Sequence, residues 1–227
     1  MNDITTPHVN VVLLGPPGSG KGTQAALLGK EFSLFHFSTG EMFREAVRQG
    51  SDLGRIVEEI MRKGELVPDD VLYSLVKQKV ASVASKGKGI LFDGYPRTLV
   101  QCEQLDEILA ANDLVLQRVV FIDVPEDILV KRLSGRLYCP KCSANYNEYY
   151  KPPKTDNTCD ECSHELARRS EDYPEAIQER LNVYKRQTLP LLNYYRGKEK
   201  LSEVNGGNNV DVVFNEICVI MRRFGTS

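Results

Sequence analysis

Apolar residues in this 227-residue chain form short runs that alternate with longer segments of helical periodicity. The first run, Val11-Val12-Leu13-Leu14, is apolar at consecutive positions, which is typical of a strand buried on both faces of a parallel sheet. Strands are expected at residues 11–14, 34–37, 90–93, 119–124 and 200–204. Helices are expected at residues 21–32, 53–61, 98–111, 125–136, 174–195 and 210–224, and two more should begin near Ser38 and near Pro68. This alternation predicts an α/β fold in which helices cover both faces of a parallel five-stranded sheet.

The segment between residues 137 and 172 does not follow this pattern. Helical spacing stops there, Cys, Pro, Tyr, Asn and Thr become frequent, and helical spacing resumes at Pro174. We therefore expect an insert with an irregular backbone in this part of the chain.

A glycine-rich segment joins the first predicted strand to the first predicted helix. It reads Gly15-Pro16-Pro17-Gly18-Ser19-Gly20-Lys21-Gly22-Thr23 and fits the phosphate-binding pattern G-x-x-x-x-G-K-[ST], except that Gly22 separates the lysine from Thr23. Glycines let backbone N–H groups turn toward phosphate oxygens, and the N-terminus of the following helix favours an anion at the same place. A glycine-rich turn without a ligand is the alternative. The strand before and the helix after favour a P-loop that binds a nucleoside triphosphate, with Lys21 beside the terminal phosphates.

Asp93 ends the predicted strand 90–93, and open α/β sheets bind ligands at the carboxyl ends of their strands. A carboxylate at this edge can organise the Mg²⁺ that accompanies a triphosphate, directly or through water. Asp93 could instead cap the turn that follows it. The P-loop upstream favours the magnesium role.

Four of the six cysteines form two Cys-x-x-Cys pairs inside the irregular insert. Sixteen residues separate the first pair from the second, a spacing within the range of four-cysteine zinc sites. The four predicted ligands are Cys139, Cys142, Cys159 and Cys162. A structural Zn²⁺ would order a small insert that lacks a sufficient core of its own. Four unconnected thiols are the alternative, and His164 could compete with Cys162 as a ligand, although four thiolates already complete the shell.

Charge argues against a nucleic-acid partner. The chain carries 29 Lys and Arg against 31 Asp and Glu, a formal net charge of −2, and the segment 136–172 holds six basic and seven acidic residues. No apolar run approaches the roughly 18 residues of a membrane span, and residues 1–10 contain no apolar signal core. Cys-x-x-Cys pairs of this kind are typical of a reducing compartment, so a cytoplasmic protein without a membrane partner is expected.

Taken together, these motifs resemble the long-form adenylate kinases. The resemblance runs from about Val11 to Phe224 and rests on the P-loop, the four-cysteine insert and two further motifs. These two motifs are Ser38-Thr39-Gly40-Glu41-Met42-x-Arg44 and Asp93-Gly94-Tyr95-Pro96-Arg97 with Gln101. The chain departs from the family pattern at Tyr95, where Phe is commoner, and at Glu41 and Glu171, where Asp is more usual.

The resemblance implies a monomeric, Mg²⁺-dependent enzyme that converts ATP and AMP reversibly into two ADP by direct in-line transfer, and so keeps the adenine nucleotides in balance. It implies a P-loop core (residues 1–37, 68–134 and 173–227), a small helical AMP-binding domain (38–67) and a zinc-ribbon-like lid (135–172). No protein nucleophile is needed, because alignment, charge neutralisation and exclusion of water suffice for transfer between two bound nucleotides.

The resemblance also implies the residues of the site. The residues expected to bind AMP are Thr39, Arg44, Glu65, Leu66, Val67, Gly94, Tyr95, Pro96, Arg97, Gln101, Arg169 and Arg180. The residues expected to bind ATP are Gly18, Ser19, Gly20, Lys21, Gly22, Thr23, Arg132, Arg136, Asn145, Tyr146 and Asn208. Catalysis is expected from Lys21, Arg97, Arg132, Arg136, Arg169 and Arg180, and Mg²⁺ binding from Asp93 and Thr23.

Two further expectations concern the charged residues of this site. Arg132 and Arg136 lie four residues apart on the predicted helix 125–136 and should face the same side of it. The acidic pair Glu171-Asp172 either orients the neighbouring arginines or caps the helix that begins at Pro174.

Three other functions compete with this one. A related kinase could use UMP or CMP as the acceptor, although Thr39 and Gln101 favour adenine. GTP could replace ATP as the donor within the same fold. A protein of another class, a zinc-ribbon regulator that senses nucleotides without turnover, would share the P-loop and the cysteines.

Overall fold

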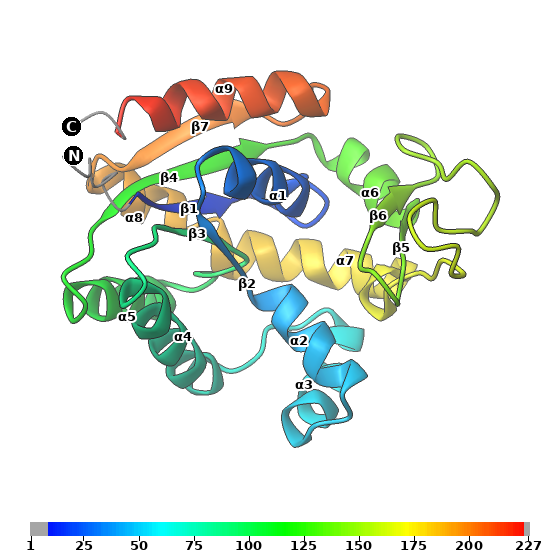
Figure 1. The fold of residues 1–227 in the computed structure, drawn as a ribbon, viewed down its shortest axis with the longest axis horizontal. Coiled ribbons are helices and arrows are strands. Elements are labelled where there is room, and N and C mark those ends of the chain that lie inside the picture. The colour runs from blue at the N-terminus through cyan, green and yellow to red at the C-terminus, as the bar shows by residue number, and fades with distance from the viewer. Residues whose placement is uncertain (1–8, 225–227) are drawn as a thin grey trace, which may run out of the picture.

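The computed structural model describes residues 9–224, and within them five parallel strands form the central sheet (Figure 1). Their order across the sheet is β2-β3-β1-β4-β7, and every neighbouring pair is parallel. The strands are β1 (Asn10–Leu14), β2 (Phe35–Ser38), β3 (Ile90–Asp93), β4 (Leu116–Asp123) and β7 (Leu201–Asn205). The predicted five-stranded parallel sheet is confirmed.

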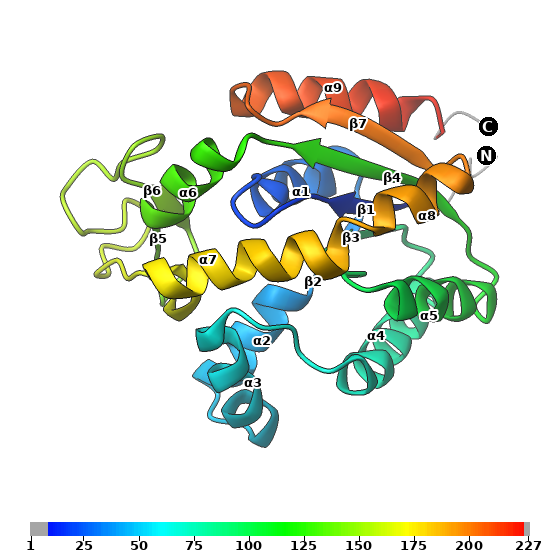
Figure 2. The same cartoon turned by 180° about the vertical axis from the view of Figure 1, so that it is seen from behind.

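Helices cover both faces of this sheet (Figures 1 and 2). One face carries α1 (Lys21–Glu31), α6 (Glu126–Ser134) and α9 (Val210–Arg222), and the other carries α4 (Asp69–Ala84), α5 (Leu99–Ala110) and α8 (Leu191–Gly197). Side chains alternate along β1, because successive residues of a strand point to opposite faces. Val11 and Leu13 pack on the α1 side, and Val12 and Leu14 pack on the α5 side. Burial on both faces explains why the strand is apolar throughout.

The predicted helix 174–195 is interrupted. It consists of α7 (Pro174–Val183), a π-helical turn η2 (Tyr184–Thr188) and α8. Pro190 has no N–H to continue the hydrogen-bond ladder, which favours an irregular turn before it. The wide turn carries the buried Thr188, whose hydroxyl donates to the carbonyl oxygen of Arg97 at 2.9 Å. Helical spacing in the sequence does not reveal such a turn.

The helix predicted to reach Arg136 ends earlier. α6 stops at Ser134, Gly135 is its C-cap, and a Cβ on Gly135 would lie 2.5 Å from the Tyr149 ring. Arg136 begins the short strand β5 (Arg136–Tyr138), which pairs antiparallel with β6 (Asn145–Asn147). The prediction that Arg132 and Arg136 share a helix face is therefore wrong.

Two inserts project from the sheet. The helical insert, residues 38–67, contains α2 (Thr39–Arg48) and α3 (Asp52–Lys63), and the Ser38 hydroxyl caps α2 by accepting from the Glu41 N–H. The lid insert, residues 135–172, contains β5, β6 and a 3₁₀ turn η1 (Ser170–Asp172). The views from both sides show the lid insert at one end of the molecule beyond α6, and α7 running between the two inserts (Figure 2). Among residues 9–224, no helix has the length and apolarity needed to cross a bilayer.

Candidate active site

A cleft of about 840 Å³ lies between the carboxyl edge of the sheet and the two inserts. Eight Lys and Arg residues line it, against four Asp and Glu residues. A cavity with this excess of positive charge favours an anionic ligand.

The P-loop forms one wall of the cleft and leads directly into α1. Gly18 and Gly20 have φ values of 83° and 95°, in the left-handed region that glycine tolerates. A Cβ on Gly18 would lie 3.0 Å from Cγ of Leu133, so the loop packs closely on α6. Lys21 Nζ donates to the carbonyl oxygens of Gly15 at 2.7 Å and Pro16 at 2.9 Å. The loop thus curls around the lysine at the N-terminus of α1, where backbone N–H groups favour phosphate.

Burial and the nearby arginines lower the pKa of Lys21 to about 7, although the charge of Asp93 opposes this shift. Asp93 ends β3, and its Oδ2 lies 3.3 Å from His36 Nε2. Burial alone would raise the pKa of the Asp93 carboxyl, but the His36 hydrogen bond and the charge of Lys21 hold it below its ordinary value. The carboxylate is therefore ionised, and an anionic oxygen at a strand end beside a P-loop fits Mg²⁺.

The carbonyl oxygen of Gly94 positions two of the predicted acceptor-side residues. Thr39 Oγ1 donates to it at 2.9 Å, and Arg97 Nε donates to it at 2.8 Å. Gly94 has a φ of 79°, and a Cβ there would lie 2.9 Å from both Thr39 Oγ1 and Arg97 Nη2. A side chain at this position would push both groups away, so the motif needs glycine here.

Asp172 joins two arginines at the base of the lid insert. Arg136 donates to its two carboxylate oxygens, both at 2.6 Å, and Arg180 donates to Oδ1 at 2.6 Å. The Asp172 side chain is 0 % exposed, and the N-cap of α7 is Tyr173, which makes no side-chain cap. Of the two roles predicted for the acidic pair, the contacts match the orientation of arginines and not the capping of α7.

Glu171 adds an ion pair with the helical insert to those that Asp172 makes, because Arg44 Nη1 lies 3.3 Å from Glu171 Oε1. Arg169 donates to Asn145 Oδ1 at 2.7 Å. Burial, followed by the charge of Arg136, lowers the pKa of Arg180 to about 10 and that of Arg169 to about 9. Several guanidinium groups are therefore held close together in a partly desolvated space, where a multiply charged anion relieves their repulsion.

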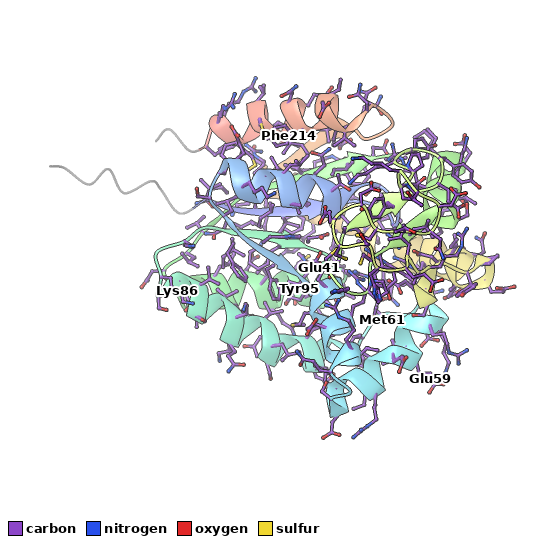
Figure 3. All side chains as sticks on the ribbon, turned by 45° about the vertical axis from the view of Figure 1, so that its right-hand side comes forward. Glu41, Glu59, Met61, Lys86, Tyr95 and Phe214 are labelled. Carbon is purple, nitrogen blue, oxygen red and sulfur yellow. The ribbon has the colours of Figure 1, made fainter. Side chains whose placement is uncertain are left out.

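The structure brings nearly all of the predicted nucleotide-site residues to this one cleft. Residues of the P-loop, the lid insert, α6, α7 and the loop before α9 line it, namely Gly18, Ser19, Gly20, Lys21, Gly22, Thr23, Arg132, Arg136, Asn145, Tyr146, Arg169, Arg180 and Asn208. The residues that line it from the opposite side are Thr39, Arg44, Glu65, Leu66, Val67, Asp93, Gly94, Pro96, Arg97 and Gln101. Tyr95 differs, because its side chain is 1 % exposed and packs in the core in the middle of the molecule (Figure 3).

The four predicted metal ligands form a compact cluster in the lid insert. Their sulfur atoms all lie within 4.8 Å of one another, and His164 is not among the residues grouped with them. The Cys139–Cys162 and Cys142–Cys159 sulfur pairs are 3.4 and 3.5 Å apart. A hydrogen bond from the Tyr146 hydroxyl is the main cause that lowers the pKa of Cys159 to about 6, which favours the thiolate that binds metal.

The two Cys-x-x-Cys turns repeat the same backbone hydrogen bonds. Ser143 N–H donates to the Cys139 carbonyl and Ser163 N–H to the Cys159 carbonyl, each at 2.9 Å. Cys139 N–H then donates to Ala144 at 2.9 Å, as Cys159 N–H does to His164 at 2.8 Å. Two matching turns that bring four sulfurs together are compatible with a tetrahedral structural zinc.

The sequence did not identify two residues that support the site. Asp69 begins α4, and its carboxylate accepts from Gln101 Nε2 at 2.6 Å. Thr188 holds the backbone of Arg97, as described above. Both partners lie far away in the chain, so no local pattern could indicate these contacts.

A P-loop at the edge of a parallel sheet, facing clustered arginines across one cleft, defines a P-loop kinase of small phosphorylated molecules. The family model for adenylate kinase matches residues 13–200, and the chain belongs to the adenylate kinase family. It is 44% identical over 216 residues to an adenylate kinase of Methanothrix thermoacetophila, covering 95% of this chain and 100% of that protein. Adenylate kinases of Archaeoglobus fulgidus (44% identity; 95% and 99% covered) and Oceanobacillus iheyensis (42%; 95% and 100%) are similar over comparable lengths.

Family membership confirms the resemblance inferred from the motifs and the prediction of an enzyme. The chain is a nucleotide-binding transferase of the nucleoside monophosphate kinase type, whose reaction is ATP + AMP = 2 ADP. Adenylate kinases use Mg²⁺ together with ATP.

Proposed function

We propose that this chain transfers the terminal phosphoryl group of ATP, bound at the P-loop, to AMP bound beside the helical insert. The observation that carries the proposal is the convergence of Lys21, Asp93 and the arginines in one cleft. Such a cleft can align two nucleotides end to end and neutralise the charge that spreads over the transferring group.

We assign the acceptor to the side formed by the helical insert and the end of β3. Thr39 and Gln101 would contact adenine, with Glu65, Leu66 and Val67 lining the pocket beside them. Arg44 and Arg97 would hold the AMP phosphate, because a guanidinium group matches two phosphate oxygens at once.

We assign the donor to residues 18–23 of the P-loop, and Asn145, Tyr146 and Asn208, which line the same cleft, would surround the rest of the nucleotide. Lys21, Arg97, Arg132, Arg136, Arg169 and Arg180 would surround the phosphoryl group in transit. Exclusion of water requires the inserts to cover it, so we infer that residues 38–67 and 135–172 act as separate domains on the core formed by 1–37, 68–134 and 173–227.

We assign Mg²⁺ to Asp93, with Thr23 beside it, and structural Zn²⁺ to Cys139, Cys142, Cys159 and Cys162. Magnesium bound with ATP would neutralise part of the charge on the phosphate oxygens. We also propose a cytoplasmic monomer without nucleic-acid or membrane partners, which the near-neutral charge and the paired cysteines support.

Lys21→Met tests the proposal in a coupled assay of ADP formation from ATP, AMP and Mg²⁺. We expect the rate to fall by about 10²- to 10³-fold, as when a transition-state donor is removed. Lys30→Met is the matched control, because Lys30 is exposed in the last turn of the same helix, and it should keep the wild-type rate.

The acceptor and donor are tested with AMP, UMP and CMP, and with GTP in place of ATP. AMP should be the best acceptor and ATP the better donor. A faster rate with a pyrimidine nucleotide, or release of orthophosphate without ADP, would contradict the proposal.

A further inference from the structure

The side-chain amide of Gln101 is held at both ends. Its Oε1 accepts from the backbone N–H of Arg97 at 2.7 Å, and its Nε2 donates to Asp69 Oδ1 at 2.6 Å. The side chain lines the cleft but is 0 % exposed, so no open space surrounds it in which it could turn freely.

These two partners determine which way the amide points. A backbone N–H can only donate and an ionised carboxylate can only accept, so a rotated amide would set its NH₂ group against the Arg97 N–H and its oxygen against Asp69. Both contacts would then be repulsive in a buried place, where unmade hydrogen bonds are costly. The donor on Arg97 and the acceptor on Asp69 therefore fix the orientation of the Gln101 amide.

Asp69 is itself held in place from α5. Thr98, the N-cap of that helix, donates its hydroxyl to Asp69 Oδ2 at 3.0 Å and accepts the Gln101 N–H at 3.1 Å. The start of α4 and the start of α5 are thus joined through one carboxylate, and that carboxylate faces the Gln101 amide.

We propose that Asp69 is a positioning residue that sets the base specificity of the acceptor site by fixing the Gln101 amide. With one N–H and one lone pair already used, the amide keeps one acceptor on Oε1 and one donor on Nε2. Adenine carries an exocyclic amino donor beside a ring-nitrogen acceptor, which matches that pair. Hypoxanthine and guanine carry an oxygen acceptor beside a ring N–H donor, which only the rotated amide would match.

This inference rests on the proposed function, in which Gln101 contacts the base of the monophosphate. It adds that selection of 6-amino over 6-oxo purines depends on a residue that does not touch the substrate. Cytosine presents the same donor and acceptor pair as adenine, so Asp69 is not expected to distinguish AMP from CMP.

Asp69→Asn tests the inference, because an asparagine amide can either donate or accept, which leaves the Arg97 N–H as the one partner of those two that still disfavours the rotated Gln101 amide. The measured quantity is the ratio of kcat/KM for AMP to that for IMP. We expect this ratio to fall about tenfold, the effect of one hydrogen bond in a desolvated site, with the KM for ATP unchanged. Asp70→Asn removes the same charge from the same helical turn and should leave the ratio unchanged.

A second variant and a double mutant complete the design. Asp69→Ala also removes the fixing acceptor and should lower the ratio similarly, which decides the matter if Asp69→Asn does not fold. Gln101→Ala should lower the ratio, and adding Asp69→Asn to it should lower the ratio no further. A further fall in the double mutant would show that Asp69 acts without Gln101 and would overturn the inference.

The two proposals fail in different ways. If Gln101→Ala lowers the AMP-to-IMP ratio but neither Asp69 variant does, the role of Asp69 is wrong and the base contact stands. If Gln101→Ala leaves the ratio unchanged, the assignment of Gln101 to the base is wrong, and the inference about Asp69 is overturned with it.

Discussion

The two inserts that cover the cleft are held together in different ways. In the helical insert, Phe43, Val57 and Val67 are buried and belong to the same core cluster as Phe92 of β3. In the lid insert, the buried cluster consists of Cys139, Tyr146, Cys159 and Leu166, separate from the sheet. The helical insert extends the main core, whereas the lid insert has a small separate core, in which two of the four buried residues are predicted metal ligands.

Other contacts in the inserts agree with this difference. A Cβ on Gly54 would overlap the carbonyl group of Ala46, so α3 packs directly against the end of α2. In the lid insert, Arg168 and Glu148 form an ion pair in which each side chain is more than a third exposed. Such exposed ion pairs add little to the free energy of unfolding. Apolar burial therefore orders the helical insert, and we expect a bound metal to order the lid insert.

The largest effect should come from removing the metal ligands. Structural zinc sites contribute about 10–16 kcal/mol in apparent binding free energy, far more than the small lid core can supply. In Cys159→Ser, or after treatment with a strong chelator, we expect amide hydrogens in residues 135–172 to lose protection from exchange while those in α2 and α3 keep theirs. The rate of ADP formation should fall as residues 135–172 lose this protection.

Cys218→Ala is the control for this experiment, because Cys218 is a buried cysteine of α9 outside the cluster. It should leave exchange in residues 135–172 unchanged. Equal protection of the lid insert with and without the chelator would show that no metal orders it.

Val57→Ala tests the helical insert and should have a smaller effect. Val57 is 0 % exposed, and removing two methyl groups from a shared core lowers the free energy of unfolding by about 2 kcal/mol. The neighbouring Ile56 is 59% exposed, so Ile56→Ala should change that free energy by less than about 0.5 kcal/mol. Urea denaturation measures both, and the difference should persist with a chelator present. A similar loss in both variants would argue against a continuous core.

The sequence predicted the parts of the molecule that depend on local pattern. Runs such as Ile90-Leu91-Phe92 identify buried strands, because both faces of a parallel sheet are covered. The P-loop and the cysteine pairs were likewise recognised from the spacing of their residues, which indicates phosphate binding and metal binding. The motif around Tyr95 located the cleft, but a motif does not say on which side each side chain points, and Tyr95 points into the core.

Other features depend on partners that are distant in the chain. α6 ends before Arg136 where the ring of Tyr149 covers Gly135, and helical periodicity contains no sign of that ring. The contact between Asp69 and Gln101 joins the first turns of two helices, and the contact between Thr188 and Arg97 joins a π-helical turn to a loop. Such pairs follow from the tertiary arrangement and were found only in the structure.

The smallest expected effect concerns one of the places where the two inserts meet. Arg48 of α2 donates from Nη1 to the Pro140 carbonyl at 3.0 Å and to Ser143 Oγ at 3.2 Å, in the first Cys-x-x-Cys turn. Its side chain is 38% exposed, so Arg48→Gln should lower the free energy of unfolding by less than about 1 kcal/mol.

Arg48→Gln also tests whether removal of metal from the lid insert changes amide exchange in α2. If this contact transmits disorder from the lid insert, a chelator should slightly increase amide exchange at the C-terminal end of α2 in the wild type and not in Arg48→Gln. Arg55→Gln is the matched control, since Arg55 pairs with Asp52 within α3, and it should respond like the wild type. The same chelator response in Arg48→Gln and in the wild type would mean that the helical insert is ordered independently of the lid, because its apolar contacts with the main core suffice.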